Sequence, residues 1–248
     1  MLQEERFNRI LAELDSNGAV KSVKLAELLD VSESTVRRDI NELDAKGRLK
    51  KVFGGAVRIG NDVSTFEEDV AAKSLYHRTE KDEIARYAAG LIEDGDMVYI
   101  DAGTTTERMI DYIENHSAIY MTNGIVHARK LALRGFEVGI VSGSVKAKTL
   151  SIIGTRAVQS MASYNFTKCF MGTNGIDIKK GFTTPDLDEA MVKEEAVKLS
   201  KNVYVLADSS KFEKIFSVTF AKLKGSCIIT DKLHNDLYRE YAAIKEVD

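Results

Sequence analysis

VSESTVRRDINELDAKGRLKKVFGGA, residues 31–56, is the stretch that decides the fold of the amino-terminal part of this chain. Ser32 is a suitable N-cap for a helix that runs to about Lys46, and Gly47 then stops that helix. The apolar residues of the helix recur at helical spacing: Val36, Ile40 and Leu43. This spacing predicts a short helix with one buried face.

The opposite face of the same helix is polar. At about 100° per residue, it carries Ser34, Arg38 and Asn41, with Thr35 and Arg37 on its flanks. Hydroxyl, guanidinium and amide groups on such a face can read base edges in the major groove of DNA. We expect Arg38 to contact a guanine, Asn41 an adenine and Arg37 a phosphate.

A basic hairpin is predicted directly after this helix. Two short β-like runs flank Gly54-Gly55, the pattern of a wing, and residues 46–58 contain five basic side chains and no acidic one. We expect Lys50, Lys51 and Arg58 to lie over phosphates and to add salt-dependent affinity.

Two further helices precede the decisive stretch. The first is predicted from about Gln3 to Asn17 and ends at Gly18; the second, Val23–Leu29, has Ser22 as its expected cap. The tight connection Asp30-Val31-Ser32 joins it to the polar-faced helix. The alternative is an ordinary three-helix bundle with a solvated face, but the helices, turn and basic wing together favour DNA binding.

Composition is ordinary for a globular protein of 248 residues, with 44% hydrophobic and 29% charged residues and a net charge of −3. No apolar run is long enough to span a membrane, and the first residues are too polar for a secretory signal. We expect the two cysteines, Cys169 and Cys227, to be buried free thiols. These features predict a cytoplasmic protein.

The rest of the chain alternates apolar strand-like runs with helical stretches after a predicted linker at residues 59–75. A helix is expected from about Thr79, and further helices at Thr106–Glu114, Ile125–Leu133, Thr155–Ser163 and Asp186–Ser200. Strands are expected at Met97–Asp101, Ala118–Thr122, Phe136–Ser142, Thr167–Met171, Val203–Ala207 and Cys227–Thr230. The alternation predicts an α/β fold with a mostly parallel sheet.

Ligands bind beyond the carboxyl ends of the strands in such sheets. The first strand ends in Asp101-Ala102-Gly103-Thr104-Thr105-Thr106, where free N–H groups at a helix start favour an anion. Three other strand ends are small and polar: residues 122–124, 142–144 and 172–175. Lys193 and Lys211 can supply positive charge. The plainer alternatives are a Thr-capped turn and two solvated lysines.

Residues 31–56 resemble the DeoR-type winged helix-turn-helix of bacterial sugar-catabolism regulators, and the match covers almost all of residues 1–58. Phe53 stands where that family more often has His or Tyr. The runs EKDEIARYAAGLIEDGD, DAGTTTERM, MTNG, GTNGID and LADSSKF resemble the DeoR-family sensor domain, which is similar to the ribose-5-phosphate isomerase and CoA-transferase fold.

The resemblance implies a phosphosugar effector, with its phosphate at the Gly103–Thr106 turn. Effector-binding positions matching the family are Asp101, Gly103, Thr104, Thr105, Thr106, Asn123, Lys193, Asp208 and Lys211. Gly143 is also a candidate, although Ser142-Gly143-Ser144 departs from the Gly-Gly common there. Fructose 1-phosphate is the first candidate effector and tagatose 6-phosphate the second.

An isomerase-like enzyme is the main alternative, because several carboxylates are available as a general base: Asp101, Asp186, Asp188 and Glu189. No nucleophile elbow, metal-ligand cluster or dinucleotide fingerprint is present, so we expect a regulator with no catalytic residue, cofactor or metal. A third possibility, a ligand-free degenerate domain, is disfavoured by the polar strand ends.

The expected organisation is a DNA-binding domain at residues 1–58, the linker, and an effector-sensing domain at 76–248. A homodimer or homotetramer would place two polar-faced helices in successive major grooves of double-stranded operator DNA, about 34–36 Å apart. The family resemblance implies repression relieved by the phosphosugar; the residues themselves do not determine the sign of regulation.

Overall fold

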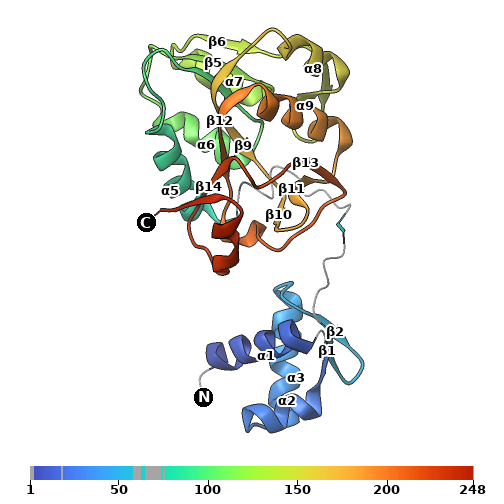
Figure 1. The fold of residues 1–248 in the computed structure, drawn as a ribbon. Helices are drawn as coiled ribbons and strands as arrows, with labels where there is room; N and C mark the ends of the chain where they lie inside the picture. The colour runs from blue at the N-terminus through green and yellow to red at the C-terminus, as the bar shows by residue number, and fades with distance from the viewer. Residues whose placement is uncertain (1–2, 18, 58–62, 65–73, 75, 248) are drawn as a thin grey trace. The chain divides into compact units, whose positions relative to one another are not determined.

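The computed structural model describes residues 3–17, 19–57, 63–64, 74 and 76–247. The chain divides into two compact units, residues 1–62 and residues 63–248. Figure 1 shows both units, each with its own helices and strands.

The amino-terminal unit is a three-helix bundle with a small antiparallel sheet. Its elements are α1 (Gln3–Asn17), β1 (Ala19–Lys21), α2 (Ser22–Leu29), α3 (Glu33–Ala45), β2 (Lys50–Val52) and β3 (Gly55–Val57). The strand order is β1-β3-β2. Apolar residues from all three helices meet in one core, among them Phe7, Leu25 and Ile40. The winged helix-turn-helix fold is therefore confirmed, and β1 is a strand that the sequence did not predict.

The two predicted helix caps had different outcomes. Ser32 is the N-cap of α3, and its hydroxyl accepts a hydrogen bond from Thr35 N (3.2 Å), as predicted. The prediction for Ser22 was wrong, because β1 runs directly into α2 and the extended Lys21 holds the cap position. Ser22 N instead donates to Gly54 O of the wing (2.9 Å). Gly18, the predicted end of the first helix, lies outside the described residues.

The carboxyl-terminal unit contains α-helices, short 3-10 helices and strands in alternation. Its helices are α5 (Arg78–Ala89), α6 (Thr104–Tyr112), α7 (Ile125–Leu133), α8 (Thr155–Met161), α9 (Leu187–Lys198), η1 (Ser209–Lys211) and η2 (Asp236–Glu240). Its main-sheet strands are β4 (Met97–Ile100), β5 (Ile119–Thr122), β6 (Val138–Ile140), β9 (Phe166–Gly172), β12 (Ser200–Leu206), β14 (Ser226–Thr230) and β15 (Ala243–Glu246).

The main sheet has the order β15-β14-β12-β9-β4-β5-β6, and every neighbouring pair in it is parallel. Successive side chains point to opposite faces. Val98 and Ile100 pack in one core with α5, α6 and α7, whereas Tyr99 packs in a second core with α8 and α9. Helices therefore cover both faces (Figure 1), and the predicted α/β class is confirmed.

Smaller antiparallel sheets accompany the main sheet. They contain the pair β7 (Ser144–Lys146) and β8 (Ser151–Ile153), and the three strands β10 (Gly175–Asp177), β11 (Gly181–Thr184) and β13 (Val218–Ala221). None of these strands was predicted from the sequence. The predicted strand at 136–142 is shorter in the structure, where β6 spans only Val138–Ile140. Cys169 is buried and Cys227 only half-buried, and both are free thiols.

Candidate functional site

The polar face of α3 is open to solvent. Ser34, Arg37, Arg38 and Asn41 are exposed, and Thr35 is half-buried. The hydroxyls of Ser34 and Thr35 hydrogen-bond with the Ser32 hydroxyl (2.8 and 2.9 Å), and the Arg37 guanidinium pairs with Glu33 (3.0 Å).

Among the described residues, Arg38 and Asn41 have no side-chain partner. They are the groups on this face that are free to bind a ligand without first breaking a contact. Lys50 and Lys51 of the wing are also exposed, and Arg58 lies outside the described residues.

A buried ion pair holds α3 in place. Asp39, on the inner side of the helix, accepts hydrogen bonds from Arg6 Nε (2.6 Å) and Nη2 (3.0 Å) of α1. Burial of a charged pair is tolerated when the geometry is bidentate, as here. The Arg6–Asp39 contact therefore fixes the rotation of α3 and keeps its polar face outward.

A cavity of about 430 Å³ lies in the carboxyl-terminal unit, at the carboxyl ends of β4, β9 and β12. The chain order reverses between β4 and β9: β5 and β6 follow on one side and β9, β12, β14 and β15 on the other. This is the switch point at which open α/β sheets bind their ligands. Predicted residues that line the cavity are Asp101, Gly103, Thr104, Thr105, Lys193, Asp208 and Lys211.

The turn from β4 to α6 forms one wall of the cavity. The first intrahelical hydrogen bond of α6 runs from Glu107 N to Gly103 O (2.9 Å). The N–H groups of Thr104 and Thr105 precede that bond, so the helix itself does not satisfy them. Gly103 N is already bonded to the Thr106 hydroxyl (3.0 Å). Thr104 and Thr105 therefore present backbone donors and the positive end of the helix dipole to the cavity.

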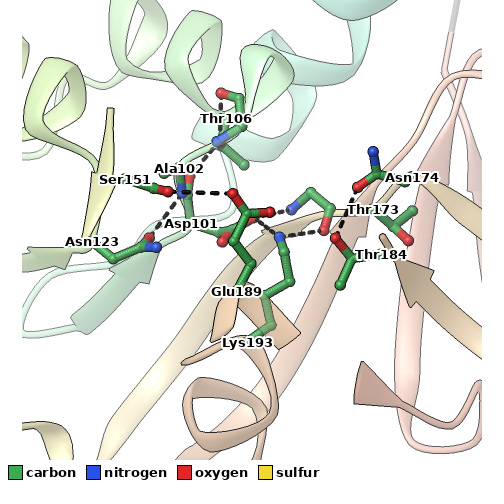
Figure 2. A network of polar contacts seen from close by, with 12 residues as sticks. Asp101, Ala102, Thr106, Asn123, Ser151, Thr173, Asn174, Thr184, Glu189 and Lys193 are labelled. Carbon is green, nitrogen blue, oxygen red and sulfur yellow. Dashed lines mark hydrogen bonds and ion pairs between the residues drawn. The ribbon is translucent and has the colours of Figure 1, made fainter. Parts of the chain in front are cut away.

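Lys193 of α9 enters the cavity from the opposite wall. Its ammonium pairs with Asp101 Oδ2 and donates to Gly172 O (3.0 Å). Gly172 N donates to the same Asp101 oxygen (2.9 Å). Figure 2 shows Lys193 directed at Asp101. Asp101 therefore balances the charge of Lys193.

Asp208 carries the most informative buried atom. Its side chain is almost wholly buried, and its Oδ2 has no hydrogen-bond partner among the described residues. Burial acts to raise the pKa of this carboxyl, but the charge of Lys211, the Ser210 hydrogen bond and the charges of His77 and Lys81 together lower it below its usual value. Asp208 is thus an ionised acceptor in the cavity wall, suited to a ligand hydroxyl.

Three predicted residues lie outside the cavity lining. Thr106 is buried, where its hydroxyl donates to Asp101 O (2.5 Å). Asn123 accepts from Ala102 N (2.9 Å), so it holds the β4–α6 turn from below (Figure 2). Gly143 is exposed, and a Cβ there would lie 2.8 Å from Ile152 Cγ2 and from Ile153 O. The structure supports a positioning role for Thr106 and Asn123 and close packing at Gly143.

Four further cavity residues are not among the predicted effector-binding residues: Lys81, Lys148, Asn174 and Glu189. Asn174 lies in the polar strand end predicted at residues 172–175, and Glu189 was considered only as a general base. Lys81 had a signal that was missed: it continues the apolar face of α5, three and four residues before Ile84 and Ala85, and is only 3% exposed. A lysine in an apolar stripe indicates a buried charge with a specific task. Lys148 lies in the turn between β7 and β8, where no periodicity marks it.

Glu189 ties the turn between β7 and β8 to α9. Its Oε1 accepts from the Thr149 hydroxyl (2.9 Å), and Lys146 lies 3.2 Å from the same oxygen. Lys146 also pairs with Asp186, the N-cap of α9 (2.9 Å). These contacts bring Lys148 and Thr149 to the cavity wall.

Comparison with known proteins identifies the family. Residues 6–61 match the DeoR-like helix-turn-helix domain, and residues 76–232 match the DeoR C terminal sensor domain. This chain belongs to the DeoR family. It is a DNA-binding transcriptional regulator and not an enzyme. None of the described helices is long and apolar enough to span a membrane, and the described residues hold no metal-binding group of three His, Cys, Asp or Glu.

Curated relatives match this regulator along nearly its whole length. An uncharacterized HTH-type transcriptional regulator FruR of Bacillus subtilis is 41% identical over 100% of this chain and 99% of the relative. The HTH-type transcriptional regulator IolR of the same organism is 36% identical, covering 91% and 90%. A lactose phosphotransferase system repressor of Staphylococcus epidermidis is 32% identical, covering 97% and 96%.

Solved structures with a similar arrangement include ribose 5-phosphate isomerase A from Methanocaldococcus jannaschii. It is 13% identical, covers 53% of each chain and has a TM-score of 0.40.

Proposed function

We propose that this DeoR-family regulator represses a sugar-catabolism operon in the cytoplasm, and that a phosphorylated sugar bound in the cavity relieves the repression. The observation that supports an effector site is the composition of the cavity wall. It combines a helix amino terminus, lysines and one ionised carboxylate oxygen without a partner among the described residues. The relative named as a lactose phosphotransferase system repressor supports repression of a sugar operon.

Operator DNA is bound by the exposed face of α3 and by the wing. Arg38 reads a guanine and Asn41 an adenine, the bases with which these side chains form two hydrogen bonds in the major groove. Both side chains are exposed and lack partners among the described residues. Ser34 faces the groove with them, Thr35 flanks that face, and Arg37 binds a phosphate after exchanging its present pairing with Glu33. Lys50, Lys51 and Arg58 bind phosphates, which makes affinity depend on salt.

The phosphate of the effector is bound at the amino terminus of α6. The N–H groups of Thr104 and Thr105 point to this end of the helix, and Gly103 allows close approach because it carries no side chain. Lys211 and Lys81 add positive charge. Lys193 contributes less net charge because Asp101 neutralises it.

The hydroxyl groups of the sugar are bound by polar side chains of the cavity lining. Asp208 Oδ2 accepts one of them, and Asn174 and Glu189 of the lining offer further acceptors and donors. A ligand with several hydroxyls and a dianion matches a lining that combines a carboxylate acceptor, lysines and a helix amino terminus. Fructose 1-phosphate is the first candidate and tagatose 6-phosphate the second.

A thermal-shift screen tests the effector proposal. Full-length protein is heated with inorganic phosphate, with fructose 1-phosphate, tagatose 6-phosphate and other sugar phosphates, and with the free sugars. We expect at least one sugar phosphate to raise the unfolding temperature and its free sugar to have no effect. The shift should be lost in Lys211→Met and retained in Lys180→Met, which removes an exposed lysine that does not line the cavity. Stabilisation by a free sugar alone, or by nothing in the panel, would contradict the proposal.

Regulation requires that binding of the sugar phosphate and binding of operator DNA affect each other. If the sugar phosphate favours a state with weak operator affinity, DNA must lower the affinity for the sugar phosphate by the same factor. A homodimer or homotetramer supplies the two α3 helices that successive major grooves need, about 34–36 Å apart. Sedimentation of the protein with and without DNA measures the assembly, and titration of the sugar phosphate into the complex measures the linkage.

A further inference from the structure

Phe53 in the wing is a large apolar side chain that the described residues of its unit leave uncovered. Phe53 is exposed to 108% of its reference area, more than any other large hydrophobic residue described. It lies with Gly54 in the two-residue turn between β2 and β3, where Gly54 adopts a φ of +79°. Figure 1 shows this hairpin standing out from the three helices of its unit. An aromatic ring kept in water is unfavourable, so its retention at a tip suggests a partner.

The tip is fixed to its unit. Gly54 O accepts a hydrogen bond from Ser22 N of α2 (2.9 Å), and Lys51 N donates to Asp44 Oδ1 of α3 (2.8 Å). Gly55 lies so close to β1 that a Cβ there would be 2.1 Å from Val20 O. The wing therefore cannot fold back over its own unit without breaking these contacts, and Phe53 keeps a fixed position relative to α3.

The charges around Phe53 favour nucleic acid as the partner. Lys50 and Lys51 precede it and are exposed, and no acidic residue occurs between Ala45 and Ile59. The phosphate backbone separates the major groove from the minor groove. With α3 in a major groove, a basic hairpin beside it can reach the adjacent phosphates, and its tip can reach the minor groove.

We propose that Phe53 inserts into the minor groove beside the site read by α3, where its ring wedges against a base step. Apolar wedges of this kind unstack steps that deform easily, such as TA and CA. The wing thereby adds sequence preference at base pairs that α3 does not touch. This inference rests on the proposed binding of operator DNA by α3.

The test uses full-length protein and a consensus duplex selected with that protein from a random DNA pool. In one set of duplexes, inosine replaces guanine at successive positions outside the α3 site. Inosine keeps the major-groove acceptors and removes the amino group of guanine from the minor groove. We expect the wild type to bind certain inosine duplexes more tightly, and Phe53→Ala to lose this response.

Two further variants separate the ring from the charges. Phe53→Ala should weaken binding to the selected duplex roughly 10- to 100-fold, as expected for loss of a buried aromatic contact, without changing the salt dependence. Lys51→Ala should lower the slope of log affinity against log salt by about 1. Phe53→Tyr keeps the ring and should retain the inosine response.

If Phe53→Ala bound the selected duplex as tightly as the wild type, or showed the same inosine response, the proposal that Phe53 acts as a wedge would be wrong. Capture of Phe53 by a second copy of the chain would appear as a change in sedimentation of Phe53→Ala without DNA, and this too would overturn it. Failure to select any duplex would instead refute the DNA binding on which the inference rests.

Discussion

The ammonium of Lys193 on α9 and the carboxylate of Asp101 at the end of β4 form an ion pair in which both side chains are almost wholly buried. Gly172, at the end of β9, completes the contact by accepting from Lys193 and donating to Asp101. The pair therefore joins three walls of the cavity at one point. Since the two charges cancel, it sets the position of the β4–α6 turn more than it attracts an anion.

Asp101→Asn should destabilise the carboxyl-terminal unit, because Lys193 would remain buried without a counter-charge. Breaking one side of a buried pair costs roughly 3–5 kcal/mol. Urea unfolding measures this by tyrosine fluorescence, since all nine tyrosines lie between Tyr76 and Tyr241 and the chain has no tryptophan.

Two controls accompany this prediction: removal of a charge outside the pair, and replacement of both members of the pair. Asp188→Asn, which removes an exposed charge, should stay within about 0.5 kcal/mol of the wild type. Asp101→Asn with Lys193→Met removes both charges and should recover most of the loss. A single Asp101→Asn variant as stable as the wild type would contradict the assignment.

Asp208→Asn should weaken effector binding while leaving the fold intact. Asp208 Oδ2 has no hydrogen-bond partner among the described residues, so replacing it removes an acceptor that only the ligand uses. Loss of a hydrogen bond to a charged group costs about 1.5–3 kcal/mol. Calorimetric titration with the sugar phosphate found in the screen measures the change, and Asp188→Asn is the matched control. Unchanged affinity of Asp208→Asn for the sugar phosphate would show that Asp208 does not bind a hydroxyl of the effector.

Arg38→Ala should reduce the discrimination between operator and other DNA. A bidentate contact with guanine contributes about 1–3 kcal/mol against the wrong base. Lys50→Ala should instead weaken binding to all sequences by a similar factor. Competition assays with the selected duplex and its single-base variants distinguish the two. If Arg38→Ala binds every duplex equally less well, Arg38 contacts a phosphate.

The main sheet could be predicted because its strands are apolar on both faces and are separated by amphipathic helices. Met97–Ile100 and Ile119–Thr122 are such strands. By contrast, β1, β7 and β10 are only three residues long. β1 pairs with β3, which is distant in sequence, whereas β7 and β10 pair with the next strand of a short hairpin. A run of three residues shows no period, so tertiary context alone makes it a strand.

The candidate site could be predicted only where a strand end marks it. Gly103 and Thr104 follow β4 directly, so their place in the cavity followed from the topology. Asn123 also follows a strand, but its amide is used to hold the neighbouring turn. Which polar group faces the ligand and which supports the wall depends on side-chain geometry that spacing does not encode. Lys148 comes from the turn between β7 and β8, which contacts α9 although the two segments are far apart in the sequence.

His127 on α7, in the cavity wall, should make the free energy of unfolding depend on pH. Its ring is buried, with Nε2 3.1 Å from Gly103 O and 3.2 Å from the Thr106 hydroxyl. Burial lowers the pKa of His127 to about 4, against the opposing effects of Asp101 and the Gly103 carbonyl. The imidazole in the folded protein is therefore neutral at physiological pH.

The unfolded chain binds a proton at His127 near pH 6.5, whereas the folded chain does so only near pH 4. Stability is therefore fully present above pH 6.5 and falls as the pH falls, because the unfolded state binds more protons. Between pH 7.5 and 5.0 this residue should account for a loss of about 2 kcal/mol in the free energy of unfolding. His127→Gln cannot titrate, so urea unfolding at the two pH values should show a loss smaller by that amount. Because the carboxylates titrate alike in both proteins, equal losses would mean that the His127 ring is protonated, or reached by water, in the folded state.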